Sequence, residues 1–176
     1  IGLKKKDLDR LGISARNASE IIGASSVKLL GFPDNRMDSV DFLDVIKAVE
    51  KEVNLLKPQI VVTHHNGDLN IDHRLIHDAV ITACRPEPGQ SVIRLLAFEV
   101  PSSTEWQQNK VFQPNWFEDI SNTIDTKMDA LKVYKSEMRD WPHARSLKNV
   151  KNLAMLRGSS VGCEAAEAFM LIREFS

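Results

Sequence analysis

The apolar residues of the chain follow two periodicities, which together predict alternating helices and strands. From Val40 to Leu55 apolar side chains recur at helical spacing, and the Lys57-Pro58 step ends that helix. The nearly continuous apolar run at Ile60-Val-Val-Thr63 indicates a buried strand. Helical spacing returns from Ile71 to Ala83, so a second helix is expected after the strand.

The rest of the chain fits the same alternation. Residues 16–22 are predicted to be the end of a helix that stops at Gly23, and further helices are predicted at 124–134 and 147–157. Strands are predicted at 27–30, 92–100 and 168–175, a turn at 32–35 and a loop at 141–146. Strands that alternate with helices over short connections are typical of an α/β domain with a largely parallel sheet. The length of 176 residues suits a single domain, 1–176, with one core.

The composition argues against several classes of function. The 23 Lys and Arg residues nearly balance the 24 Asp and Glu residues and are scattered, so we expect no broad basic surface for nucleic acid or anionic membrane. No apolar run reaches the roughly 20 residues that span a bilayer. Cys84 and Cys163 lie far apart, which suits a reduced cytoplasmic protein better than a disulfide scaffold.

The densest chemistry follows the predicted strand at 60–63. Residues 64–77 contain four of the five histidines of the chain. In α/β sheets, ligand sites form beyond the carboxyl ends of the strands. We therefore expect this segment to share a cleft with the loop from Pro101 to Trp106, which follows the next predicted strand.

His73 and His77 are the most direct candidates for metal binding. They are four residues apart and would share a helix face, so both could bind one metal ion. A helix whose polar face carries two histidines explains that spacing equally well. The carboxylate of Asp72 beside His73 favours zinc, which is usually held by three protein ligands in an enzyme, although no single segment here supplies three.

The residues between the strand and the helix have structural as well as catalytic explanations. His64 and His65 follow a strand, where consecutive side chains point to opposite faces, so at most one is expected to face the cleft. Gly67 would permit a backbone turn, while Asp68 and Asn70 could simply cap the next helix.

Two later loops contain candidates for substrate contact. His143 and Arg145 place an imidazole beside a guanidinium, which suits a hydroxyl-rich or anionic group, although a solvated loop explains them too. Ser102, Ser103 and Glu105 could bind substrate or cap a helix.

The histidine-rich segment resembles a motif of a known family. Thr63-His-His-Asn-Gly-Asp-Leu-Asn-Ile-Asp-His73 is similar to the second motif of the PIG-L (LmbE-like) zinc-dependent de-N-acetylases. Further similarity to a bacterial branch of that family occurs at Phe32-Pro-Asp-Asn35, Ser102-Ser-Thr-Glu-Trp106, Phe112-Gln-Pro-Asn115, Tyr134-Lys-Ser-Glu-Met-Arg139, Pro142-His-Ala-Arg-Ser146 and Arg157-Gly158. The resemblance implies a Rossmann-like three-layer sandwich with a mostly parallel sheet. It also implies removal of the acetyl group from an N-acetylglucosamine-type sugar or glycan precursor.

The same resemblance implies roles for individual residues. His73 would be a zinc ligand, and Asp72 would orient a group near the metal. Asn70 stands where some relatives carry a histidine that stabilises the oxyanion, and it can donate a neutral hydrogen bond there. His65 is assigned to catalysis with Asp72 and Asn70, although His64 and His143 remain alternatives as the general acid. The residues assigned to substrate contact are Asp68, Arg74, Glu105, His143 and Arg145.

One departure from the family limits these expectations. The first family motif, His-Pro-Asp-Asp-Glu, supplies two zinc ligands and the general base, and it does not occur in these residues. We therefore expect the first strand-helix unit of the fold to be missing, and these 176 residues alone to be inactive. A sugar-binding or regulatory protein of the same fold is one alternative, and a metallohydrolase that uses both His73 and His77 is another. The resemblance also allows a homo-oligomer.

Overall fold

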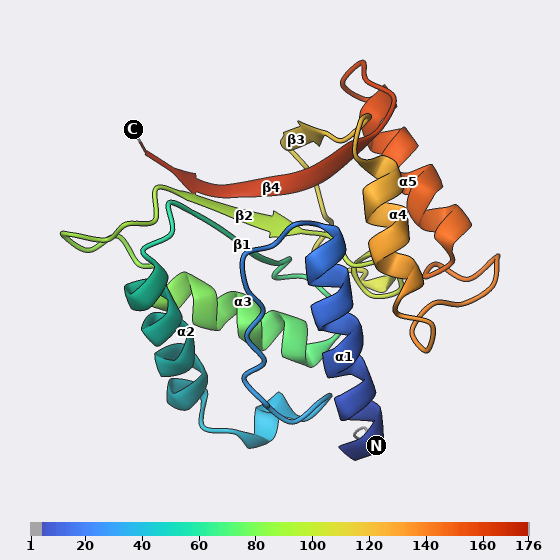
Figure 1. Cartoon of the computed structure of the whole chain (residues 1–176). Coiled ribbons are helices and arrows are strands. Elements are labelled where there is room, and N and C mark those ends of the chain that lie inside the picture. The colour runs from blue at the N-terminus through green and yellow to red at the C-terminus, as the bar shows by residue number, and fades with distance from the viewer. Residues whose placement is uncertain (1–4, 176) are drawn as a thin grey trace. The chain divides into compact units, whose positions relative to one another are not determined.

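The computed structural model describes residues 5–175 and has a mixed α/β architecture (Figure 1). Where the sequence predicts one domain, the structure divides into two compact units. The first comprises the described parts of Ile1–Gly31 and Phe117–Ala168, and the second comprises those of Phe32–Trp116 and Phe169–Ser176. Each unit is described by itself.

Four strands form an open sheet in the order β1-β2-β4-β3. Their bounds are β1 (Ile60–His64), β2 (Arg94–Phe98), β3 (Trp116–Asp119) and β4 (Ala166–Glu174). β1 and β2 pair in parallel, with His64 opposite Phe98. β4 runs antiparallel to β2, with an irregularity between Leu95 and Leu96. The sheet is therefore mixed, whereas the sequence pattern predicts a largely parallel one.

In the unit that contains β1, two helices lie on the same side of β1 and β2 (Figure 1). They are α2 (Phe42–Leu56) and α3 (Ile71–Ala83), which pack against each other while α3 also contacts β1. Asp41 caps α2 by accepting a hydrogen bond from the Leu43 amide at 2.9 Å. Lys57 adopts a left-handed conformation with φ of 47° and ends α2 at the predicted position before Pro58.

The core of this unit consists of two clusters of small and branched apolar residues between the helices and the sheet. The first centres on Val45 and Ala79, and the second on Val92 and Leu95, all of which are almost completely buried. This packing fixes the carboxyl ends of β1 and β2 and the beginning of α3, where the candidate residues lie.

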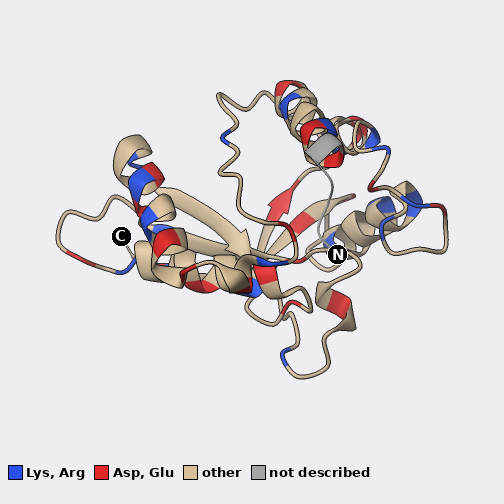
Figure 2. Cartoon of the chain, turned by 90° about the horizontal axis from the view of Figure 1, so that it is seen from below, with Lys and Arg blue, Asp and Glu red and all other residues tan. Residues whose placement is uncertain are grey.

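The other unit contains three helices: α1 (Lys5–Ile21), α4 (Ile124–Lys132) and α5 (Leu147–Ser159). α4 packs against both α1 and α5, and the Ser14 hydroxyl donates a 3.1 Å hydrogen bond to the Val133 carbonyl just after α4. Gly158 allows α5 to approach the following loop, since a Cβ there would lie 2.7 Å from the backbone of Ala165. Acidic and basic residues are interspersed along the helices of both units (Figure 2).

Some of the predicted elements differ from those observed. The strand predicted at 27–30 is wrong: the segment has no regular structure, and the side chains of Val27, Leu29 and Leu30 are exposed. β2 is shorter than the predicted strand at 92–100, and the short strand β3 is not predicted at all. None of the described helices is both long enough and apolar enough to cross a membrane.

Candidate functional site

The loops after β1 and β2 lie together, as the parallel order of these strands predicts. The His65 amide donates to the Phe98 carbonyl at 3.1 Å, and the Leu69 amide donates to the Ser103 carbonyl at 3.4 Å. These backbone hydrogen bonds join segments more than 30 residues apart. The shared position at one edge of the sheet is therefore confirmed, and it brings the histidine-rich segment against Ser103 and Thr104.

Asp68 is the centre of this arrangement and is fully buried, with 0% of its surface exposed. Its carboxylate accepts hydrogen bonds from the Ser103 hydroxyl, the Thr104 hydroxyl at 2.7 Å and the Asn70 amide at 2.9 Å. The Nδ1 atom of His73 lies 3.0 Å from Asp68 Oδ1, within ion-pair distance but without the geometry of a hydrogen bond. Asp68 therefore holds two loops and one histidine ring together.

The surroundings of Asp68 keep it ionised. Burial opposes the charged form, but the contact with His73 and the hydrogen bonds from Ser103, Thr104 and the Asn70 amide outweigh it. The pKa of Asp68 consequently lies well below its ordinary value. The assignment of Asp68 to substrate contact stays a prediction; in this structure its oxygens are enclosed and already accept several hydrogen bonds.

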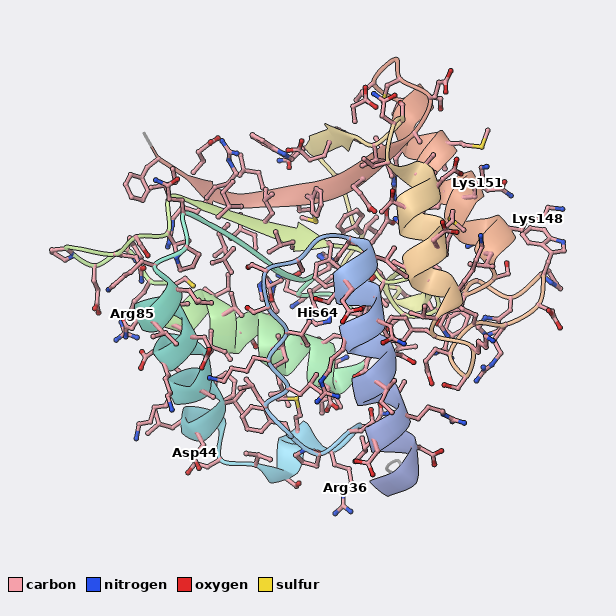
Figure 3. All side chains as sticks on the ribbon, in the orientation of Figure 1. Arg36, Asp44, His64, Arg85, Lys148 and Lys151 are labelled. Carbon is pink, nitrogen blue, oxygen red and sulfur yellow. The ribbon has the colours of Figure 1, made fainter. Side chains whose placement is uncertain are left out.

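His73 lies near the beginning of α3, and its side chain is 23% exposed. With Nδ1 facing Asp68, its Nε2 atom is the nitrogen left to bind a metal or a substrate. The His64 ring stacks on that of His73, with centroids 4.2 Å apart and an angle of 17° between the planes. His64 is labelled in Figure 3. Two imidazoles from β1 and α3 thus lie face to face beside a buried carboxylate.

The environment of His64 favours its neutral form. Burial lowers the pKa of His64 to about 4; repulsion from protonated His73 and His77 adds to this, whereas Asp68 opposes it. The ring also contacts Phe98 at a centroid distance of 4.7 Å. Its buried Nδ1 atom has no hydrogen-bond partner in the described part of the chain. His64 is therefore a neutral imidazole near pH 7.

The other two histidines of the segment have structural contacts. His77 is 7% exposed, and its Nδ1 atom lies 2.7 Å from the His64 carbonyl, to which it can donate. His65 is 2% exposed; its Nε2 atom lies 3.1 Å from the Lys110 carbonyl, and its ring packs edge-on against Phe112. Of the two consecutive histidines, it is therefore His64 that lies beside His73. The proposed catalytic role of His65 finds no support in these contacts.

Asn70 and Asp72 join the beginning of α3 to the loop before α2. The Asn70 side chain caps α3 by accepting from the Asp72 amide at 2.8 Å, as the capping alternative predicts. Its Nδ2 atom donates to Asn35 at 3.1 Å, and Asp72 accepts from the Met37 amide at 3.0 Å. The Phe32-Pro-Asp-Asn35 loop, one of the segments that resemble the family, is thus attached to the candidate site.

Gly67 is required by close packing. An added Cβ would lie 2.6 Å from both the Lys110 carbonyl oxygen and the His65 Nε2 atom, and still closer to the Lys110 Cβ. Such separations are not tolerated between non-bonded atoms. Gly67 therefore lets the segment after β1 pass against the chain at Lys110.

Arg74 and Glu105, both assigned to substrate contact, hold loop backbone in this structure. The Arg74 guanidinium donates to the carbonyls of Asp68 and Leu69 at 2.8 and 2.7 Å. The Glu105 carboxylate accepts from the amides of Ser102 and Ser103 at 2.6 and 3.2 Å, which agrees with the capping alternative. Both side chains stabilise the loops around Asp68.

His143 and Arg145 belong to the other unit. The His143 Nδ1 atom accepts a hydrogen bond from the Arg145 amide at 3.0 Å, and the Arg145 guanidinium pairs with Glu137 at 3.0 Å. Their assignment to substrate contact stays a prediction, and the structure shows them ordering the loop that leads into α5.

Across residues 5–175, no three or more His, Cys, Asp or Glu side chains come together in a group that could hold a metal ion. His73 stays a predicted zinc ligand, and a catalytic zinc site usually has three ligands from the protein. The described residues therefore do not form a complete zinc site.

Comparison with known proteins supports the resemblance to the PIG-L family. The sequence pattern of the family described as GlcNAc-PI de-N-acetylase (PIG-L) matches residues 13–84, which include the segment around Asp68 and His73. The chain is also 33% identical over 131 residues to the Escherichia coli protein named uncharacterized deacetylase YaiS, a match that covers 69% of this chain and 63% of that protein. Residues 13–84 therefore match the PIG-L family, as the sequence motifs predict.

A second curated relative is a Bacillus cereus protein named probable N-acetyl-alpha-D-glucosaminyl L-malate deacetylase 2. It is 28% identical over 163 residues, covering 88% of this chain and 67% of that protein. The chain thus spans about two thirds of the length of these curated relatives.

Solved structures share the fold at lower identity. GalB of Pseudomonas putida, the 4-carboxy-2-hydroxymuconate hydratase, superposes with a TM-score of 0.77 at 21% identity, covering 99% of this chain and 76% of that one. The N,N'-diacetylchitobiose deacetylase of Pyrococcus horikoshii superposes with a TM-score of 0.73 at 16% identity, covering 94% and 64%. These similarities show the Rossmann-like fold expected from the sequence. Because one of the two proteins is a hydratase and the other a deacetylase, the shared fold does not identify the reaction.

Proposed function

We propose that this chain is part of a zinc-dependent hydrolase that removes the acetyl group from an N-acetylglucosamine-type sugar or glycan precursor. The observation that supports this most directly is the pairing of His73 with the buried carboxylate of Asp68 within the residues matched to the PIG-L family. Carboxylates behind metal-binding histidines fix the ring orientation and raise the basicity of the ligating nitrogen. The deacetylase names of two curated relatives support the reaction class.

In this proposal His73 would hold zinc through Nε2. Zinc, when bound, would polarise the substrate carbonyl and lower the pKa of a water molecule. The remaining ligands would come from the first family motif, which these residues do not contain. The chain's own residues position the His73 ring through Asp68 and shield one of its faces with His64.

Asn70 is the proposed donor to the acetamide carbonyl. One hydrogen of its Nδ2 atom is directed to Asn35, and the amide has a second hydrogen that can reach a substrate oxygen. The cap that Asn70 forms at α3 would hold that amide in place, since a fixed donor costs no reorganisation during the reaction. Asp72 would support this position through its bond to the Met37 amide.

The test uses the protein in its full natural length with N-acetylglucosaminyl malate and N,N'-diacetylchitobiose as substrates, measuring the free amine released. We expect turnover that depends on added zinc and is lost in His73→Ala, whereas His77→Ala retains zinc because the His77 Nδ1 atom faces the His64 carbonyl. Turnover that persists after removal of metal and in His73→Ala would contradict the proposal.

A sugar-binding protein of the same fold is the second candidate. It is favoured by the absence of a complete group of metal ligands among residues 5–175. Saturable binding of the acetylated sugars without release of amine, in the zinc-loaded full-length protein, would support this candidate over the hydrolase.

A further inference from the structure

A basic depression lies in the unit that contains α4 and α5, and none of its lining residues has a proposed catalytic role. Its volume is about 720 Å³, and the segment that joins the two helices forms most of its wall. The lining residues are Lys132, Lys135, Met138, Arg139, Asp140, Trp141, Ser146, Leu147 and Lys148. Four of these side chains are cationic, and one is anionic.

The positive charge of this depression is only partly neutralised. Lys132 pairs with Asp129 at 2.7 Å. Arg139 donates to the backbone carbonyls of Ser136 and Met138, and no carboxylate pairs with it among residues 5–175. A guanidinium held by neutral carbonyls keeps its full charge and its remaining N–H donors for an anion.

The aromatic ring of Trp141 forms part of the lining of the depression. The Lys148 ammonium lies 4.8 Å from the centroid of Trp141, which is within the range of a cation–π contact. Trp141 is 52% exposed, and Lys148 is exposed as well. Lys148 lies at the beginning of α5, and Lys151 lies further along the same helix (Figure 3).

The beginning of α5 adds to the positive potential of the depression. Ser146 caps this helix by accepting from the Asn149 amide at 3.1 Å, and the first turn contains no acidic residue. The partial positive charge at a helix N-terminus is therefore not offset there and adds to that of Lys148 and Arg139.

We propose that this depression binds the phosphate or diphosphate group of a small molecule. The lining combines cationic side chains with one tryptophan, which suits a compact anionic group attached to a less polar moiety. A long nucleic acid fits less well, because the basic residues form a single cluster. None of the lining residues is among those assigned to zinc binding or catalysis, so neither proposal depends on the other.

The experiment is a titration of the protein with inorganic pyrophosphate, followed by calorimetry and by tryptophan fluorescence. EDTA is present so that metal bound at His73 cannot capture the anion. We expect saturable binding that is weakened at least about fivefold, or about 1 kcal/mol, in Arg139→Gln and in Lys148→Gln. Lys151→Gln is the matched control, because Lys151 is an exposed α5 lysine outside the lining, and it should change the affinity less than about twofold.

Two further measurements make the test specific. Raising NaCl from about 0.1 to about 1 M shortens the Debye length from about 10 to about 3 Å and should weaken the binding. Trp141→Phe should remove the fluorescence change, because Trp106 and Trp116 do not line the depression. No saturable binding to the wild-type protein would overturn the proposal. Equal weakening in Lys151→Gln, or unchanged affinity in an Arg139→Gln and Lys148→Gln double variant with a native circular dichroism spectrum, would also do so.

Discussion

Replacement of Asp68 by asparagine tests whether this buried carboxylate holds the candidate site together. Asparagine keeps the size of the side chain but removes the charge and converts one oxygen into a donor. If its oxygen takes the place of Oδ1, its amide nitrogen faces the Thr104 hydroxyl, which already accepts from the Val100 amide at 2.7 Å. The bonds from the Ser103 hydroxyl and the Asn70 amide lose their ionic character.

The structure sets the size of the expected loss. Hydrogen bonds to a charged partner contribute about 1.5–3 kcal/mol net, against about 1 kcal/mol for neutral ones. Weakening two such bonds and reversing a third should lower the free energy of unfolding by about 2–4 kcal/mol in Asp68→Asn. Asp68→Ala removes the acceptor of the buried Ser103 and Thr104 hydroxyls and should cost at least as much.

The measurement is urea unfolding at pH 7, followed by circular dichroism, together with hydrogen exchange of the amides of β1 and α3. Hydrogen exchange reports on the affected unit even if the two units unfold separately. Asp78→Asn, an exposed carboxylate on α3, is the control and should change the stability by less than about 0.5 kcal/mol. A loss below about 1 kcal/mol in Asp68→Asn, or one equal to that of the control, would refute the reasoning.

Three further predictions follow from packing and protonation. Gly67→Ala should lower the free energy of unfolding by about 1–3 kcal/mol, because the methyl group meets the Lys110 carbonyl; unchanged thermal unfolding would contradict this. Cys163 should react with a thiol reagent in the native protein while Cys84, which is 0% exposed and whose pKa is raised by burial, reacts only on unfolding; mass spectrometry of the alkylated protein distinguishes them. His64 has a folded pKa of about 4 against an ordinary 6.5, so the unfolded chain binds more protons between these values and stability should rise with pH across that window. The difference in unfolding free energy between wild type and His64→Asn, measured with EDTA, should shrink as pH falls from about 6.5 to 4, and a constant difference would argue against the assignment.

Local periodicity and punctuation predict most of the elements. Apolar spacing and the proline after Lys57 predict the end of α2, and Asn70 as a cap predicts the beginning of α3. The beginning of α2 is less well predicted, because Asp41 caps the helix and the predicted start is Val40. The run at 27–30 has the composition of a strand, but a strand also needs a neighbour, and pairing is a tertiary property that short apolar runs do not encode. The resemblance to the PIG-L family is confirmed, and it identifies the family from motifs that propensity alone could not interpret.

The candidate site is predictable in position but not in its contacts. Parallel order places the ends of β1 and β2 together, which brings Asp68 close to Ser103. From the sequence, an aspartate in a polar loop can either cap a helix or contact substrate. Asp68 is completely buried because a second loop, 35 residues further along the chain, packs against it. The same limit applies to His64 and His65, because alternation says that one faces the site without saying which.

The position of β2 between a parallel and an antiparallel neighbour has a consequence for the synthesis of the protein. Arg94 on β2 pairs with Glu174 on β4, and 80 residues separate them in the chain. At about 5–20 residues per second, ribosomal synthesis of that interval takes roughly 4–16 s. Throughout that time one edge of β2 has no strand beside it and offers open amides and carbonyls to other nascent chains. We therefore expect the nascent chain to be prone to edge-to-edge aggregation until β4 has been synthesised.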